Sequence, residues 1–98
     1  EFGKSNYWLN VIIFRKFNKK KHLDEIIEYL DKKGIQARPI WKPNHLQKPY
    51  LKSQSFKIEN VIKFHESCLC LPSSSNLSQK KIVYITRTIK NYLEKTKY

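Results

Sequence analysis

The sequence contains no methionine and has only two glycines and two cysteines among its 98 residues. No apolar run approaches the length of a membrane span, and the first residues lack the basic start and apolar stretch of a secretory signal peptide. Because the two glycines lie far apart, a glycine-rich phosphate loop is excluded. The three histidines are well separated, and none stands at a metal-ligand spacing from an acidic residue or a cysteine.

Acidic residues are also scarce: 20 Lys and Arg residues stand against eight Asp and Glu, a formal net charge of +12. Such an excess favours binding to nucleic acid, anionic lipid or phosphorylated ligands, but it also fits a solvated lysine-rich surface. Only Arg15, Arg38 and Arg87 are arginines. Readers of phosphate and bases usually employ more arginine, because its planar fork grips two acceptors. We therefore expect neither nucleic acid nor a membrane as a partner.

The two cysteines, Cys68 and Cys70, lie in a predicted strand and point to the same face. They are splayed along the chain, which is a poor geometry for a disulfide, and no His or Cys partner at a ligand spacing completes a metal site. We expect reduced, partly buried thiols in a cytoplasmic protein.

The length and the apolar content predict one folded domain over residues 1–98. A chain with 40% hydrophobic and 13% aromatic residues can bury a modest core, and no internal repeat or linker divides it. The chain opens on Glu1 and Phe2 without an initiator methionine. We therefore expect an excised part of a longer protein.

The first half of the chain predicts a strand, a helix and a second strand. Residues 5–15 are aromatic and β-branched, and both faces of this strand are apolar, which is typical of a central strand covered on both sides. In so small a chain, one cover would come from another domain or subunit. Residues 18–33 carry an apolar stripe at helical spacing, and Gly34 ends that helix. Residues 35–41 then form a strand that lies at an edge or finishes at Pro39.

The second half predicts a helix, a short strand and a last helix. Ser55 caps a helix over residues 56–67, residues 68–71 form a buried strand ended by Pro72, and Ser78 caps the last helix, whose tail from residue 94 frays. Three strands and three helices of this kind make an α/β two-layer sandwich, with the helices largely on one face of a small sheet.

The stretch from residue 34 to residue 50 is densest in rigid backbone and in side chains that can hold a ligand. It contains three of the four prolines together with Trp41, His45 and Gln47. A stiff loop can present such side chains at low entropic cost. Spacing alone favours the simpler interpretation, a tight connection with Trp41 in the core and His45 at the surface. No Ser-His-Asp set has a recognisable nucleophile context, so the chain contains no complete active site by itself.

Four short stretches, in order and at natural spacings, resemble the C-terminal region of the DegT/DnrJ/StrS family of sugar aminotransferases. The resemblance covers nearly the whole chain and is carried by Ser5-Asn6-Tyr7-Trp8-Leu9-Asn10, Gly34-Ile35-Gln36-Ala37-Arg38-Pro39-Ile40-Trp41, Pro43-Asn44-His45-Leu46-Gln47, and Cys70-Leu71-Pro72-Ser73-Ser74 before Leu77-Ser78.

The resemblance implies the small domain of an aspartate-aminotransferase-type (fold type I) enzyme that uses pyridoxal 5'-phosphate. Such a parent moves an amino group, usually from glutamate, onto a nucleotide-linked keto sugar for surface polysaccharide biosynthesis. Its Schiff-base lysine and the acidic partner of the pyridine nitrogen belong to a preceding large domain. The resemblance therefore implies no catalytic and no cofactor-binding residue in this chain, and an isolated chain that is inactive.

The resemblance also implies where substrate is bound. The small domain closes one side of the active-site cleft, with His45 near the sugar nucleotide and Gln47 in the same loop. Trp41 is a wall residue of the cleft, and Arg38 meets a phosphate or the carboxylate of the amino donor. Asn44 stands where an apolar residue is more usual. The implied partners are the nucleotide sugar, the amino donor, the large domain and a second subunit in a homodimer.

Two other functions fit the residues. A small basic nucleic-acid-binding domain would use the sheet aromatics Tyr7, Trp8 and Phe14 as a stacking platform, although this strand mixes them with Ile and Leu that favour burial. An interaction module without a ligand is the third interpretation.

Overall fold

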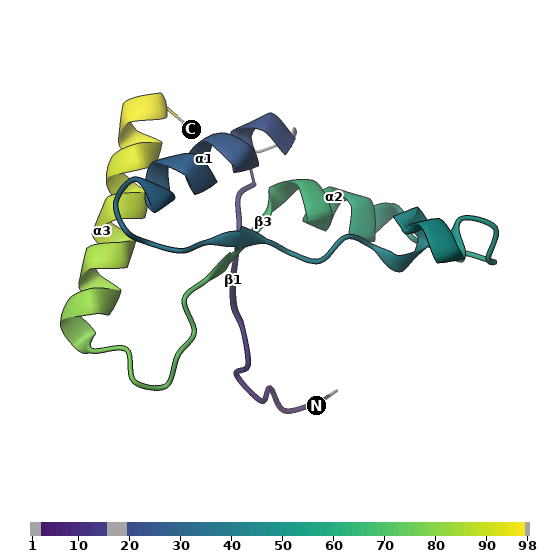
Figure 1. Ribbon diagram of the computed structural model, residues 1–98, viewed down its shortest axis with the longest axis horizontal. Helices are drawn as coiled ribbons and strands as arrows, with labels where there is room; N and C mark the ends of the chain where they lie inside the picture. The colour runs from purple at the N-terminus through teal and green to yellow at the C-terminus, as the bar shows by residue number, and fades with distance from the viewer. Residues whose placement is uncertain (1–2, 16–19, 98) are drawn as a thin grey trace.

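The computed structural model describes residues 3–15 and 20–97 and shows a small sheet with helices packed around it (Figure 1). The predicted architecture of three strands and three helices is confirmed. Its elements in chain order are β1 (Asn10–Ile13), α1 (Lys20–Asp31), β2 (Arg38–Pro39), the 3-10 turns η1 (Asn44–Leu46) and η2 (Lys48–Tyr50), α2 (Glu59–Ser67), β3 (Cys68–Leu71) and α3 (Gln79–Thr96).

The central strand of the sheet is β3, which pairs antiparallel with β1 on one side and with β2 on the other. The expectation that the first strand is central is therefore wrong. Apolar residues on both faces do not by themselves place a strand at the centre of a sheet, because three of the four residues of β1 are exposed. Val11 and Ile13 of β1 are 44% and 56% exposed.

Strand β1 is also shorter than the predicted residues 5–15. Tyr7 has a positive φ of 55°, a conformation that interrupts an extended chain. The side chains before it form local turns: the Tyr7 N–H donates to Ser5 Oγ at 3.1 Å, and the Trp8 N–H donates to Asn6 Oδ1 at 3.1 Å. Such bonds give the backbone an alternative to the sheet ladder.

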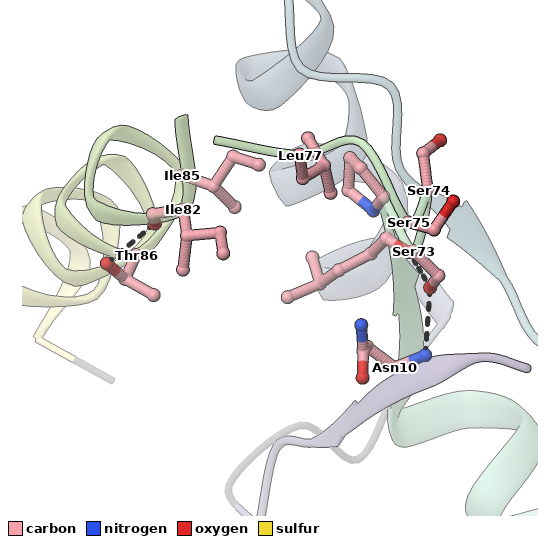
Figure 2. A pocket seen from close by; sticks show the side chains of 10 residues that line it. Asn10, Ser73, Ser74, Ser75, Leu77, Ile82, Ile85 and Thr86 are labelled. Carbon is pink, nitrogen blue, oxygen red and sulfur yellow. Dashed lines mark hydrogen bonds between the residues drawn. The ribbon is translucent and has the colours of Figure 1, made fainter. Parts of the chain in front are cut away.

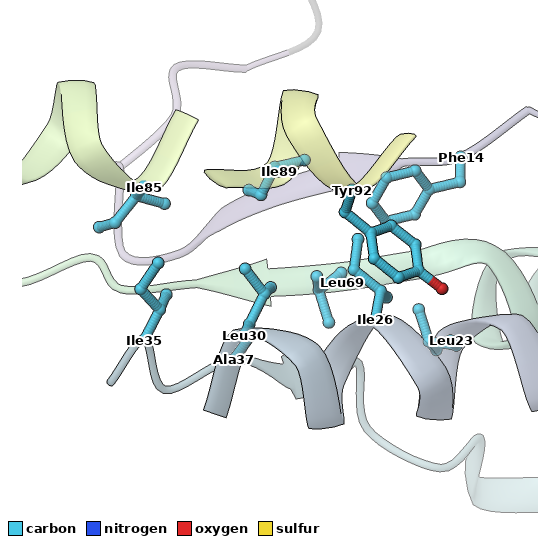
Figure 3. Packing of buried hydrophobic residues seen from close by; sticks show 10 residues of the cluster. All are labelled: Phe14, Leu23, Ile26, Leu30, Ile35, Ala37, Leu69, Ile85, Ile89 and Tyr92. Atoms are coloured by element: carbon cyan, nitrogen blue, oxygen red, sulfur yellow. The ribbon is translucent and has the colours of Figure 1, made fainter. Parts of the chain in front are cut away.

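The core lies between one face of the sheet and the helices α1 and α3, as predicted for a two-layer fold. Leu23, Ile26 and Leu30 of the predicted stripe are fully buried, and so is Leu69 of β3. Figure 3 shows the side chains of the core pointing toward one another from these elements; they are Phe14, Leu23, Ile26, Leu30, Ile35, Ala37, Leu69, Ile85, Ile89 and Tyr92.

The turn after α1 is set by Gly34, which has a φ of 71°. The Gly34 N–H donates to the Asp31 carbonyl at 2.8 Å, and the Ile35 N–H donates to the Leu30 carbonyl at 2.9 Å. These bonds satisfy carbonyls at the helix end, and glycine adopts the required left-handed conformation without strain. The predicted helix end is confirmed.

Strand β2 lies at the edge of the sheet and ends at Pro39, as predicted. It is shorter than the predicted residues 35–41, because only Arg38 and Pro39 pair with β3. Proline has no N–H to continue the ladder. The chain then leaves the sheet and runs out to η1 and η2 (Figure 1).

The prediction for the start of α2 is wrong. This helix begins at Glu59, and Ser55 does not cap it. Lys57 has a φ of 49°, which no continuous right-handed helix from residue 56 allows. Its predicted apolar stripe is only partly covered, because Val61 and Ile62 are exposed.

The predicted start of α3 is confirmed. Ser78 is the N-cap, and its hydroxyl oxygen accepts a bond from the Lys81 N–H at 3.4 Å. The helix continues through Thr96, whose hydroxyl donates to the Tyr92 carbonyl at 2.8 Å. None of the helices in residues 3–15 and 20–97 is long and apolar enough to cross a bilayer.

We predict that Leu69→Ala lowers the free energy of unfolding by about 2–5 kcal/mol, because it removes a fully buried side chain from the central strand. Urea denaturation of the 98-residue chain, followed by circular dichroism, measures this. The matched control is Ile13→Ala on the exposed face of β1, with an expected loss of about 1 kcal/mol or less. Equal losses for the two variants would contradict the assignment of the core.

Candidate functional site

The four predicted site residues lie on one segment, from β2 to Gln47, the residue that follows η1. Arg38 is on β2 directly opposite Cys70, and Cys70 is also opposite Val11 of β1. Directly opposed side chains share a face of a sheet. The exposed Arg38 side chain therefore lies on the outer face of the sheet, which also carries Val11. The core residue Leu69 belongs to the opposite face.

Arg38 also lines a shallow cleft of about 280 Å³. It is the only charged residue among those that line this cleft, so an anionic group entering there would meet a single cation. The lining residues are Leu9, Gln36, Arg38, Cys70, Leu71, Pro72, Ser73 and Ser74.

Trp41 contradicts the simpler interpretation of the loop, because its side chain is 66% exposed and is not part of the core. It contacts Trp8, with ring centroids 5.3 Å apart and ring planes tilted by 36°. Trp8 was not among the predicted site residues, and no local pattern could pair two side chains so distant in sequence. Of the aromatics proposed as a nucleic-acid platform, Phe14 is buried in the core while Tyr7 and Trp8 are exposed.

Gln47 braces the loop that contains His45. Its Nε2 donates to the Lys42 carbonyl at 2.9 Å and to Asn44 Oδ1 at 3.1 Å. The Leu46 N–H donates to the Pro43 carbonyl, and the Gln47 N–H donates to the Asn44 carbonyl, both at 2.9 Å. The loop thus contains the short 3-10 turn η1. The described contacts make Gln47 a positioning residue, and Asn44 takes part by accepting a bond from its amide.

His45 is half-buried, and its Nε2 atom has no hydrogen-bond partner among the described residues. A buried polar atom without a partner costs about 1–3 kcal/mol, so a ligand or a second protein surface that supplies the bond would recover that free energy. His65 Nδ1 on α2 is in the same state. What distinguishes His45 is the loop that Gln47 and Pro43 hold in place.

The structure does not gather the four residues into one pocket. None of the hydrogen bonds or ion pairs described for residues 3–15 and 20–97 joins Arg38, Trp41 and His45 to one another. It brings Trp41 to Trp8, Gln47 to the backbone around Asn44, and Arg38 to the cleft beside Pro72 and Ser73. Arg38 and Trp41 are exposed, whereas His45 and Gln47 are half-buried in the loop that follows.

A second cleft, of about 440 Å³, lies between α3 and the segment after β3 (Figure 2). The Asn10 N–H donates to Ser73 Oγ at 2.9 Å, and that hydroxyl donates to the Leu71 carbonyl at 2.9 Å. No charged residue and none of the predicted site residues lines this cleft, so its chemistry suits a neutral group and not a phosphate. Its lining residues are Asn10, Leu71, Pro72, Ser73, Ser74, Ser75, Leu77, Ile82, Ile85 and Thr86.

The described residues do not fit pyridoxal phosphate. A Schiff-base lysine must lie in a site that excludes water, beside groups that hold the ring and the phosphate. Every lysine side chain that the structure describes is exposed, and so is every described carboxylate except Glu66, which is half-buried. The part of the chain that the structure describes therefore supplies no site for this cofactor.

Burial raises the pKa of the Cys68 thiol and of the Cys70 thiol. At Cys68 a hydrogen bond with Ser67 acts in the opposite direction, and the neighbouring Cys70 adds to the increase. Both cysteines are free, as predicted. Because the thiolate is the nucleophile, these two residues are poor candidates for covalent chemistry.

We predict that both thiols react slowly with iodoacetamide in the native chain at neutral pH. A raised pKa keeps nearly all of each thiol protonated at neutral pH, and the reaction rate should still be increasing where the pH reaches the ordinary value of 9.0. Cys70 is half-buried and Cys68 is buried, so Cys70 should react first. Mass spectrometry of the labelled chain measures this, with the chain in urea as the control. Rapid labelling of Cys68 at neutral pH would contradict the prediction.

Comparisons with known proteins match most of this chain, including the loop that contains His45. The sequence profile of the DegT/DnrJ/EryC1/StrS aminotransferase family matches residues 2–90. EpsN of Bacillus subtilis, assigned as a pyridoxal phosphate-dependent aminotransferase, is 32% identical over 81 residues of alignment, and the match covers 79% of this chain and 20% of EpsN.

Solved structures agree with this match. Spr1654 of Streptococcus pneumoniae, assigned as a sugar aminotransferase, gives a TM-score of 0.74 at 29% identity, covering 89% of this chain and 22% of that one. Helicobacter pylori PseC, an aminotransferase of pseudoaminic acid biosynthesis, gives 0.76 at 24% identity, covering 89% and 24%, and bears on the fold alone. The predicted aspartate-aminotransferase-type fold is confirmed. The chain spans about a fifth of the length of these relatives.

Proposed function

The chain belongs to the DegT/DnrJ/EryC1/StrS aminotransferase family, and from this premise we propose that it is the C-terminal small domain of a longer sugar aminotransferase. The enzyme would transfer an amino group from glutamate to a nucleotide-linked keto sugar, and this domain would close one side of the substrate cleft. Pyridoxal phosphate would be bound by the rest of the longer protein, and residues 1–98 alone would be inactive.

The observation that carries this proposal is the extent of the family match, which includes β1, the loop after β2 and most of α3. The exposed outer face of the sheet supports it. Val11 and Ile13 present an apolar surface, and an apolar patch of this kind is usual where a second domain or subunit packs. We propose that the partners of this domain are the large domain of the same protein and a second subunit in a homodimer. We also propose that the enzyme acts in the cytoplasm, in the biosynthesis of surface polysaccharide.

We propose distinct roles for the residues of the loop. His45 would contact the sugar nucleotide, and its half-buried place in the loop that Gln47 holds supports this role. Gln47 would hold the loop. Arg38 would bind a phosphate or the donor carboxylate, since its fork grips either one with two bonds, and Trp41 would form a wall of the cleft.

The longer protein that contains this chain tests the function directly. We predict that the purified protein binds pyridoxal phosphate, seen in its visible absorbance, and converts a uridine-diphosphate-linked 4-keto hexose to the amino sugar with glutamate as donor. Mass spectrometry of the product measures the transfer. A protein that binds the cofactor but aminates no nucleotide-linked sugar would contradict the proposed substrate class, and one that binds no cofactor would contradict the reaction.

We predict that His45→Ala in the longer protein lowers kcat/KM for the nucleotide sugar roughly 10- to 100-fold, which is the cost of one lost hydrogen bond in a substrate site. Cofactor absorbance should not change, because no cofactor contact is proposed for this loop. The matched control is His22→Ala on α1, which should retain the full rate. An unchanged kcat/KM in His45→Ala would remove this residue from the site.

A further inference from the structure

Two segments of the described chain contain basic residues and no acidic residue at all. Residues 3–15 carry Lys4 and Arg15, and no Asp or Glu. Residues 32–58 also lack Asp and Glu, although the chain on either side has them at Asp31 and Glu59. The basic residues of this second segment are Lys32, Lys33, Arg38, Lys42, Lys48, Lys52 and Lys57.

The contact between Trp8 and Trp41 joins these two segments. The ring centroids are 5.3 Å apart, so each indole rests against the other on one side. Their side chains nevertheless remain 65% and 66% exposed. Two exposed indoles in contact, with ring planes tilted by 36°, form an aromatic surface where both acid-free segments meet.

The backbone on both sides of this surface is held in place. The Trp8 N–H donates to Asn6 Oδ1 at 3.1 Å. Trp41 lies between Pro39 and Pro43, and Gln47 Nε2 holds the Lys42 carbonyl at 2.9 Å. An aromatic surface that is already positioned binds a planar ligand at a lower entropic cost than a mobile one.

The cations beside Trp41 are available to a ligand. Arg38 precedes it on β2, and Lys42 follows it; both are exposed. None of the ion pairs formed by the described residues involves either of them. An aromatic face stacks with a base whatever its identity, and an arginine fork or an ammonium binds the adjoining phosphate. A nucleotide offers both groups at once.

We propose that Trp8, Trp41, Arg38 and Lys42 form a nucleotide-binding platform. The base stacks on the outer face of the indole pair, because the two rings are already in contact with each other, and the phosphates lie toward Arg38 and Lys42. The assignment of this nucleotide to the substrate of the longer enzyme rests on the proposed function. A free nucleoside diphosphate and a nucleic-acid strand share this chemistry, so the test separates them.

The chain reports on its own platform, because both of its tryptophans belong to it. Selectively excited tryptophan emission of the 98-residue chain is followed during titration with UDP, uridine, inorganic pyrophosphate and an oligouridine strand. Free tryptophan amide corrects for absorbance by the base. We expect UDP to quench the emission, uridine to bind about tenfold more weakly than UDP, and pyrophosphate to leave the emission unchanged.

Two variants and a control locate the binding. Trp41→Leu leaves Trp8 as the reporter, and Arg38→Gln removes the cation; each should weaken UDP binding about tenfold. Arg87→Gln on the exposed side of α3 removes the same charge elsewhere and should bind UDP as the parent chain does. Because Arg38 and Trp41 are exposed, far-UV circular dichroism should be the same for all three variants.

Three results would overturn the platform. They are quenching by pyrophosphate equal to that by UDP, UDP binding that Trp41→Leu leaves unchanged, and binding of the oligouridine strand without binding of UDP, which would assign the surface to nucleic acid. The titration requires no amino transfer. If the longer protein aminates its sugar but the 98-residue chain binds no UDP, the platform alone is overturned. If the chain binds UDP but the longer protein has no aminotransferase activity, the proposed function alone is overturned.

Discussion

The structure depends on the pairing of the short strand β3 with an edge strand on each side. Leu69 of this strand is fully buried against α1 and α3, and the register places Ile12 and Pro39 opposite it. Because β3 has only four residues, it can form no further backbone pairs with its neighbouring strands. One face of the sheet is therefore sealed by the two helices, and Val11 and Ile13 of the other face remain exposed.

This one-sided closure determines where the candidate site can be. A proline at the end of β2 terminates the ladder, so the chain leaves the sheet at the outer edge and carries Trp41, His45 and Gln47 with it. The Gln47 amide then holds the loop in shape. The result is a basic and aromatic rim beside the exposed Val11 and Ile13, an arrangement that suits the proposed wall of a larger cleft.

Local patterns predicted the parts of the fold that local interactions control. The stripe of Leu23, Ile26 and Leu30, the glycine turn at Gly34 and the Ser78 cap all depend on residues a few positions apart. The place of β1 in the sheet could not be predicted, because an apolar face does not say which chain covers it. The Trp8–Trp41 contact could not be predicted either, because it joins residues that are far apart in the sequence. The site residues came from a family resemblance, and whether they meet one substrate depends on groups outside this chain.

The central claim is that the rest of a longer protein covers the outer face of the sheet. Hydroxyl-radical footprinting of Val11 and Ile13, compared between the 98-residue chain and the intact protein, tests it most directly. The account predicts strong oxidation of both side chains in the short chain and clear protection in the intact protein. Equal oxidation in the two proteins would contradict the claim.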